Sequence, residues 1–329
     1  MSDVPSRVSI TEEGPREGFQ SEPPGIPTEA KLRLITALSE TGLSEVVCAS
    51  FVNARLLPQM ADAEHIAAGL VRRPGVAHLA LWLTRGGFER ARASGLGLRA
   101  VVATSASATF LMRNNNRTPE QGLADQLALC AAYDEAGLPD GPAYIFTAFG
   151  CNYEGDIPVL TVMSRIADLL RIVRDAGRDV SRVVLCDTVG AGNPALVERL
   201  TGELRSRWPD LPVGLHLHDT RGLGIANAAA GLRLGVDHFD ASVGGLGGCP
   251  FAGNKAAAGN IATEEFVFLC EEMGIATGVD LEALIEVGRL AAEIVRHDLP
   301  SRLLRAGSLS RFRTDGNASA GSRPSKTGH

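Results

Sequence analysis

Short runs of β-branched residues alternate with longer segments of helical period along most of this 329-residue chain, and this alternation constrains the fold most. It predicts a parallel sheet, because consecutive parallel strands need a crossover connection, usually a helix. The predicted strands are Val8–Glu12, Glu45–Ser50, His78–Thr84, Arg99–Thr104, Ala143–Thr147, Arg182–Cys186, Val213–His218 and Val236–Ser242. The predicted helices between them include Thr28–Thr41, Asp62–Arg73, Gly87–Ser94, Thr118–Ala136, Pro158–Ala176, Pro194–Arg207 and Ile225–Leu234. Eight strands favour a closed α/β architecture, the (β/α)8 TIM barrel, over a doubly wound sheet of about five or six strands.

The chain after the eighth strand predicts three further segments. A helix begins at about Ala262, with Thr263 as its cap and Glu264 as an acid in its first turn. An extra helix at Asp280–Val295 could pack on the barrel or on another subunit, which makes a homodimer reasonable. From Pro300 the composition, rich in Ser, Arg, Gly and Asn, predicts a disordered tail. We therefore expect a barrel at 1–279, an appended helix at 280–299 and a tail at 300–329.

Charge and cysteine usage exclude several classes of protein. The formal charge of -6 argues against a nucleic-acid partner, which would need a basic face. The scattered cysteines predict neither a disulfide framework nor a Cys-x-x-Cys zinc site. The N-terminus lacks a signal or transit pattern, and no apolar run reaches the roughly 18 residues that span a bilayer. We expect a cytoplasmic protein without a membrane partner.

His216 and His218 form the strongest candidate site. Residues i and i+2 of a strand point to the same side, so both imidazoles project into the mouth of the barrel, where active sites of this fold lie. A single histidine is more often a core residue, but this pair, followed by Asp219, favours a metal. Imidazoles with a carboxylate and an amide oxygen suit Mg²⁺, Mn²⁺ or Co²⁺, and suit zinc less without thiolates.

Two other stretches carry candidate catalytic groups. Arg16 and Glu17 follow the first strand within a tight turn, and this position favours a catalytic pair over an ordinary solvated one. The stretch Gly244–Gly248 precedes Cys249 and predicts a mobile loop that could bring a thiol over the barrel mouth. From these residues alone, an inert cysteine at a turn is equally well supported.

Seven motifs resemble, in chain order, those of the 3-hydroxy-3-methylglutaryl-CoA lyase family of metal-dependent barrel lyases and synthases, from about Val8 to Val279. They are GPREGFQSE, SFVNARLLPQM, GCNYEG, CDTVGAG, LHLHDTRG, GGLGGCPFA and GNIATEE. The resemblance implies a divalent metal, Mg or Mn before Co or Zn, held by Glu17, His216, His218 and Asn260. It also implies catalytic or positioning roles for Arg16, Glu17, Asp187, Cys249 and Glu264.

Three departures from the family pattern surround this site. Glu17 stands where the family has aspartate, and Val47 stands where the family has a glutamate that pairs with the arginine. Glu45 lies two residues earlier, too near the start of its strand to reach Arg16. The third strand ends LTRGGF in place of Thr-Pro-Asn. These changes make a changed substrate plausible.

The resemblance implies a lyase that cleaves a 3-hydroxy-3-methylglutaryl-CoA-like thioester to acetyl-CoA and a keto acid by a retro-Claisen reaction. Glu17 is the expected base, with His216 as its rival, Arg16 stabilises the enolate and Cys249 protonates it. One alternative is a lyase or condensing synthase for another 3-hydroxyacyl-CoA, such as citramalyl-CoA. Another is a catalytically weak barrel that binds CoA or metal.

Overall fold

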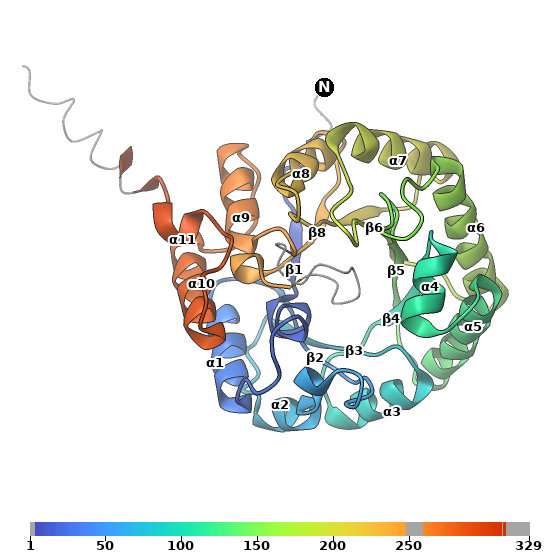
Figure 1. Cartoon of the computed structure of the whole chain (residues 1–329), viewed down its shortest axis with the longest axis horizontal. Coiled ribbons are helices and arrows are strands. Elements are labelled where there is room, and N and C mark those ends of the chain that lie inside the picture. Colours follow the sequence, from blue (N-terminus) through green and yellow to red (C-terminus); the bar gives the residue numbers. More distant parts are fainter. Residues whose placement is uncertain (1–3, 248–258, 311, 314–329) are drawn as a thin grey trace, which may run out of the picture.

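Eight parallel strands alternating with helices form the predicted (β/α)8 barrel in the computed structural model, which describes residues 4–247, 259–310 and 312–313 (Figure 1). The strands are β1 (Ser9–Glu12), β2 (Glu45–Ser50), β3 (Ala77–Leu81), β4 (Ala100–Ser105), β5 (Asp140–Phe146), β6 (Arg182–Cys186), β7 (Val213–His216) and β8 (His238–Ala241). The helices are α1 (Thr28–Leu38), α2 (Ala63–Gly69), α3 (Arg85–Ser94), α4 (Ala108–Asn115), α5 (Pro119–Glu135), α6 (Val159–Asp175), α7 (Pro194–Arg207), α8 (Gly224–Arg233), α9 (Thr263–Glu272), α10 (Leu281–Val295) and α11 (Leu303–Ala306). Short helical turns are η1 (Gly14–Gly18), η2 (Pro58–Met60) and η3 (Val243–Gly245).

The barrel is closed by β1, which pairs in parallel with both β2 and β8. The strand order is β3-β2-β1-β8-β7-β6-β5-β4, and a bridge between Leu79 and Gly97 joins β3 to the chain just before β4. Figure 1 shows the helices as a ring around the strands. Closure makes the carboxyl ends of β1, β7 and β8 neighbours, although these strands stand at opposite ends of the sequence.

The apolar core fills the layer between the strands and the helices. Phe239 of β8 and Phe266 of α9 are fully buried, with ring centroids 4.5 Å apart. Trp82, Phe88 and Tyr133 form a second aromatic cluster, in which Trp82 Nε1 donates to the Tyr133 hydroxyl at 2.9 Å. Strands covered in this way are buried on both faces, which explains their nearly continuous apolar sequences.

Polar side chains link neighbouring strands near their starts. Thr11 Oγ1 donates to Glu45 Oε2 at 2.8 Å, and Glu45 also pairs with Arg99. His238 Nδ1 lies 2.9 Å from Ser9 Oγ. Glu45 is therefore paired with Arg99 and not with Arg16, as its place in the strand predicts.

Two helices were not predicted. The helix α4 follows β4 and is capped by Ser107, whose hydroxyl accepts from the Phe110 N–H at 3.0 Å. Its eight residues end in a run of asparagines, so its pattern resembles a loop. The helix α11 lies in the segment from Pro300 that we predicted to be disordered. Leu303 belongs to the core, which explains the order there, while residues 311 and 314–329 of the predicted tail lie outside the described residues.

The appended helix α10 confirms the helix predicted at 280–295. It packs on α1, α9 and η3 of its own barrel. These contacts within the chain account for the buried face of α10 without a second subunit. The homodimer that this helix suggested therefore stays a prediction. Within the residues that the structure describes, none of the helices has the length and apolarity needed to cross a membrane.

Gly42 offers a test of the packing between the turn after α1 and the start of α10. Its φ is +93°, and a Cβ built there would lie 2.3 Å from the Gly278 carbonyl oxygen, whereas Gly75 has a φ of +83° with nothing within 4 Å. We expect Gly75→Ala to cost about 1–2 kcal/mol of unfolding free energy from the backbone conformation alone. Gly42→Ala should cost about 2 kcal/mol more, because backbone must move. Urea denaturation of both variants checks this, and equal losses would contradict it.

Candidate active site and metal centre

The turn η1 after β1 positions the first two candidate residues. Pro15 favours a turn there through its fixed φ. The backbone N–H groups of Arg16, Glu17 and Gly18 all point at the carbonyl oxygen of Glu13, at 3.1, 2.8 and 3.2 Å. This three-fold backbone attachment holds Arg16 and Glu17 side by side at the carboxyl end of β1.

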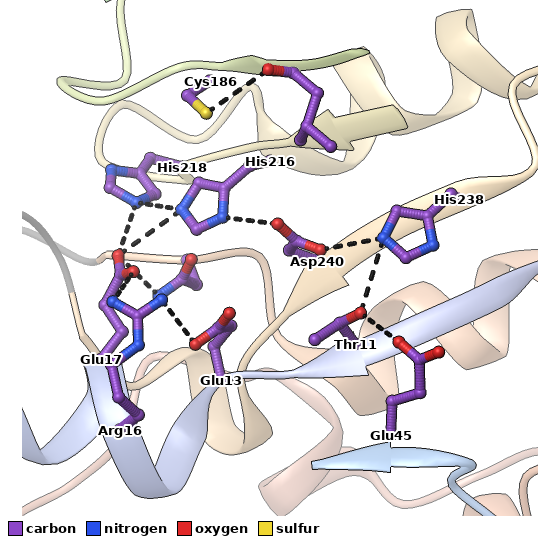
Figure 2. A network of polar contacts seen from close by, with 12 residues as sticks. Thr11, Glu13, Arg16, Glu17, Glu45, Cys186, His216, His218, His238 and Asp240 are labelled. Carbon is purple, nitrogen blue, oxygen red and sulfur yellow. Dashed lines mark hydrogen bonds and ion pairs between the residues drawn. The ribbon is translucent and has the colours of Figure 1, made fainter. Parts of the chain in front are cut away.

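His216 and His218 meet Glu17 across the barrel mouth (Figure 2). His216 ends β7, and both rings are buried. The Nε2 atoms of His218 and His216 lie 3.2 and 3.5 Å from Glu17 Oε1 and 3.2 Å from each other. The two imidazoles therefore converge on one carboxylate oxygen.

Asn260 reaches the same place on a short return segment. His218 and Asn260 form an antiparallel bridge, with the Asp219 N–H donating to the Gly259 carbonyl at 2.7 Å and the Ile261 N–H to the Leu217 carbonyl at 3.0 Å. The amide nitrogen of Asn260 donates to Glu17 Oε1 at 3.3 Å. Its Oδ1 atom is buried and has no hydrogen-bond partner among the described residues.

These donors fit a divalent metal. Glu17, His216 and His218 each offer a ligand atom, and these atoms all lie within 4.8 Å of one another. The unpartnered Asn260 Oδ1 supplies a fourth oxygen, of the kind that hard divalent ions bind. Asp240 Oδ2 lies 3.1 Å from His216 Nδ1, which fixes the ring and leaves Nε2 for a ligand bond.

Opposite charges dominate the electrostatics of this cluster. Burial alone would lower the pKa of His216, but the carboxylates of Glu17 and Asp240 outweigh it and raise that pKa to about 10. Burial would raise the pKa of Glu17, but His216 and Arg16 hold it well below its usual range. Without a metal, a protonated His216 therefore faces an ionised Glu17 at neutral pH.

Arg16 is held between two carboxylates. Its guanidinium pairs with Glu13 Oε2 at 2.6 Å through Nη2 and with Glu17 Oε2 at 2.9 Å through Nη1. Its Nε is buried without a hydrogen-bond partner among the described residues. Burial, Asp240 and Glu17 raise the pKa of Glu13, and Arg16 at 2.6 Å opposes this rise and favours the ionised carboxylate.

The other predicted site residues lie less directly on this cluster. Asp187 follows β6, and its carboxylate accepts from the backbone N–H groups of Ala191 and Gly192 at 2.7 and 3.0 Å. Glu264, in the first turn of α9, accepts from the Gly244 N–H at 3.0 Å. Both carboxylates brace loops at the mouth. Cys249 lies outside the described residues, so its role stays a prediction.

Sequence reasoning missed Glu12, Glu13 and Asp240. The Glu12 carboxylate accepts from the backbone N–H groups of Gly14 and Val243 at 2.7 and 2.9 Å and from Thr263 Oγ1 at 2.6 Å. Asp240 lies in β8, opposite His216 in the register. The period of two in β8 could have placed Asp240 inside the barrel, but only the register shows which histidine it meets.

Comparison with known proteins decides the family, since residues 7–291 match HMGL-like proteins. The chain belongs to the HMGL-like family. A hydroxymethylglutaryl-CoA lyase of Bacillus subtilis (strain 168) is 39% identical over 301 residues, which cover 92% of this chain and 97% of that protein. The mitochondrial hydroxymethylglutaryl-CoA lyase of Homo sapiens is 34% identical, covering 93% and 91%. A solved HMG-CoA lyase of Acinetobacter baumannii, in complex with coenzyme A and 3-methylmalate, has a TM-score of 0.83 at 34% identity and covers 93% and 96%.

This HMGL-like chain is thus a lyase, as the resemblance implied. Its barrel fold is also that of a solved relative. The assignment of Glu17, His216, His218 and Asn260 as a ligand set rests on the convergence of their donor atoms.

The high pKa of His216 predicts that metal binding depends on pH. A metal must displace the proton that His216 carries below pH 10, so binding releases about one proton. The affinity for Mn²⁺ should rise about tenfold per pH unit between about pH 6 and 8, measured by titration calorimetry. Asp240→Asn is the matched control, because it removes one of the carboxylates that raise this pKa and should flatten the dependence. An affinity independent of pH in the unmodified protein would contradict the assignment.

Proposed function

We propose that this protein is a divalent-metal-dependent lyase that cleaves a 3-hydroxy-3-methylglutaryl-CoA-like thioester to acetyl-CoA and a keto acid. The observation that carries the proposal is the convergence of Glu17, His216 and His218 beside Arg16 at the mouth of an HMGL-like barrel. The relatives are hydroxymethylglutaryl-CoA lyases, and one was solved with coenzyme A. We further propose Mg²⁺ or Mn²⁺ as the metal, and a cytoplasmic location.

The metal would be held by Glu17, His216, His218 and Asn260. When bound, a divalent ion at this site supplies a Lewis acid that lowers the pKa of a substrate hydroxyl. The four residues come from the ends of β1 and β7 and from the segment after the glycine-rich loop, so they define the side of the mouth on which the hydroxyl binds.

The residues around the site account for the rest of the reaction. A base, Glu17 or its rival His216, takes the proton of the substrate hydroxyl. The C2–C3 bond then breaks, and its electron pair moves onto the thioester, which stays intact. This gives a ketone and a thioester enolate. Arg16 stabilises the enolate oxygen by a charge-assisted hydrogen bond, and its unpartnered Nε–H is a donor still available. Cys249 then gives its thiol proton to the enolate carbon.

The residues near Arg16 also favour a second candidate, a lyase or condensing synthase for another 3-hydroxyacyl-CoA such as citramalyl-CoA. Val47 is a buried apolar residue of β2, and Glu13 and Glu17 place two carboxylates around Arg16. A different arrangement of charge and volume beside the catalytic arginine favours a substrate with a different acyl group.

A panel of 3-hydroxyacyl-CoA thioesters separates these candidates. With Mn²⁺ present, we expect release of acetyl-CoA from at least one thioester of the panel, and loss of that activity after the metal is chelated. Restoring Mn²⁺ should restore the rate, and the thioester with the highest kcat/KM identifies the acyl group. Turnover that survives complete chelation would contradict the metal-dependent mechanism.

Replacing Cys249 tests the proposed proton donor. We expect Cys249→Ala to lower kcat by about 10²–10⁴-fold, the range for loss of a general acid, with little change in Mn²⁺ affinity. Cys270→Ala is the control, because Cys270 is buried in α9 away from the site. A Cys249→Ala variant with full turnover would show that the thiol is not the acid.

A further inference from the structure

The guanidinium of Arg16 is clamped by its own turn. Glu13 and Glu17 flank it at 2.6 and 2.9 Å, and the three side chains are at most 12% exposed. Figure 2 shows Glu13 and Glu17 on either side of Arg16. Two separate carboxylates therefore restrain the guanidinium, with Glu13 at Nη2 and Glu17 at Nη1.

Glu13 is well placed to act as the fixed side of this clamp. Its carbonyl oxygen accepts from the backbone N–H groups of Arg16, Glu17 and Gly18, so Glu13 anchors the turn through its main chain and the guanidinium through its side chain. Glu17, in contrast, is shared with His216 and His218. A carboxylate with other partners cannot by itself set the orientation of Arg16.

Strand β2 does not supply this carboxylate. The register pairs Thr11 with Glu45 and Glu12 with Val46. The next residue along each chain places Val47 level with Glu13. Val47 is apolar and only 6% exposed.

We propose that Glu13 is the positioning residue of Arg16. It supplies, from the end of β1, the carboxylate that the resemblance placed on the second strand at Val47. Glu13 prevents the guanidinium from shifting toward Glu17, so that Arg16 keeps a donor directed at the substrate carbonyl oxygen. This inference rests on the proposed lyase function. A displacement of about 1 Å at such a group costs roughly 10²-fold in rate, which sets the size of the expected effect.

Steady-state kinetics of Glu13→Gln, which keeps the shape of the side chain, test the proposal. We expect kcat to fall by roughly 30–100-fold, while KM and Mn²⁺ affinity stay within about threefold. Glu45→Gln is the matched control, because Glu45 also lies at the β1–β2 pair and also holds an arginine, Arg99, outside the site. Its kcat should stay within about threefold of the unmodified protein. A normal kcat in Glu13→Gln, or an equal loss in Glu45→Gln, would overturn the proposal.

Moving the carboxylate distinguishes positioning from a general structural role. Glu13→Val should lose at least as much kcat as Glu13→Gln, and the double variant Glu13→Val with Val47→Glu should recover about tenfold of that loss. Recovery supports the proposal, because a merely structural role of Glu13 would not be restored from another strand. A crystal structure in which the introduced carboxylate pairs with Arg16, without any recovery of kcat, would overturn it.

A readout without substrate separates this proposal from the proposed function. If the unmodified protein cleaves no thioester of the panel, the lyase proposal fails, but crystal structures of the unmodified protein and Glu13→Gln still report on Arg16. We expect its guanidinium to move by about 1 Å relative to Glu17, or to adopt more than one conformation. An unchanged, single guanidinium position in Glu13→Gln would overturn the positioning role.

Discussion

The pairing of β1 with β8 is the constraint on which the rest of the structure depends. It closes the sheet and brings the turn that carries Arg16 and Glu17 close to His216, at the end of β7, and to His218, just after it. The buried carboxylate of Glu12 reinforces this closure, because it joins the backbone of the turn η1 to that of η3 and to the first residue of α9. One side chain thus connects the three segments that border the mouth, and its burial raises its pKa to about 7.

Where the chemistry of the family uses a metal cation, protonated side chains balance the carboxylate charges at the mouth of this barrel. His216 and Arg16 keep Glu17 ionised, and His216 and His238 keep Asp240 ionised. A divalent metal bound there would displace the proton of His216 and raise the net charge of the cluster by one. These pairings explain why a buried cluster so rich in carboxyl groups, including Glu13, is compatible with a stable fold.

Much of the fold and part of the site could be predicted from the sequence, for identifiable reasons. The alternation of strands and helices and the i, i+2 spacing of His216 and His218 are local patterns, and the structure contains both. Glu17 beside Arg16 was predicted, but its second partner, Glu13, was not, because a π-helical turn brings these i and i+3 side chains together. The short helix around Leu303 was also missed, because the segment is mostly polar and only a few of its residues join the core.

The return segment that carries Asn260 has a consequence for how such proteins change over time. Backbone hydrogen bonds tie it to Leu217 and Asp219 on one side and to Ser242 on the other, so the position of Asn260 is set by the ends of the last two strands. Selection, or a designer, can therefore alter other parts of the mouth while Asn260 stays beside Glu17.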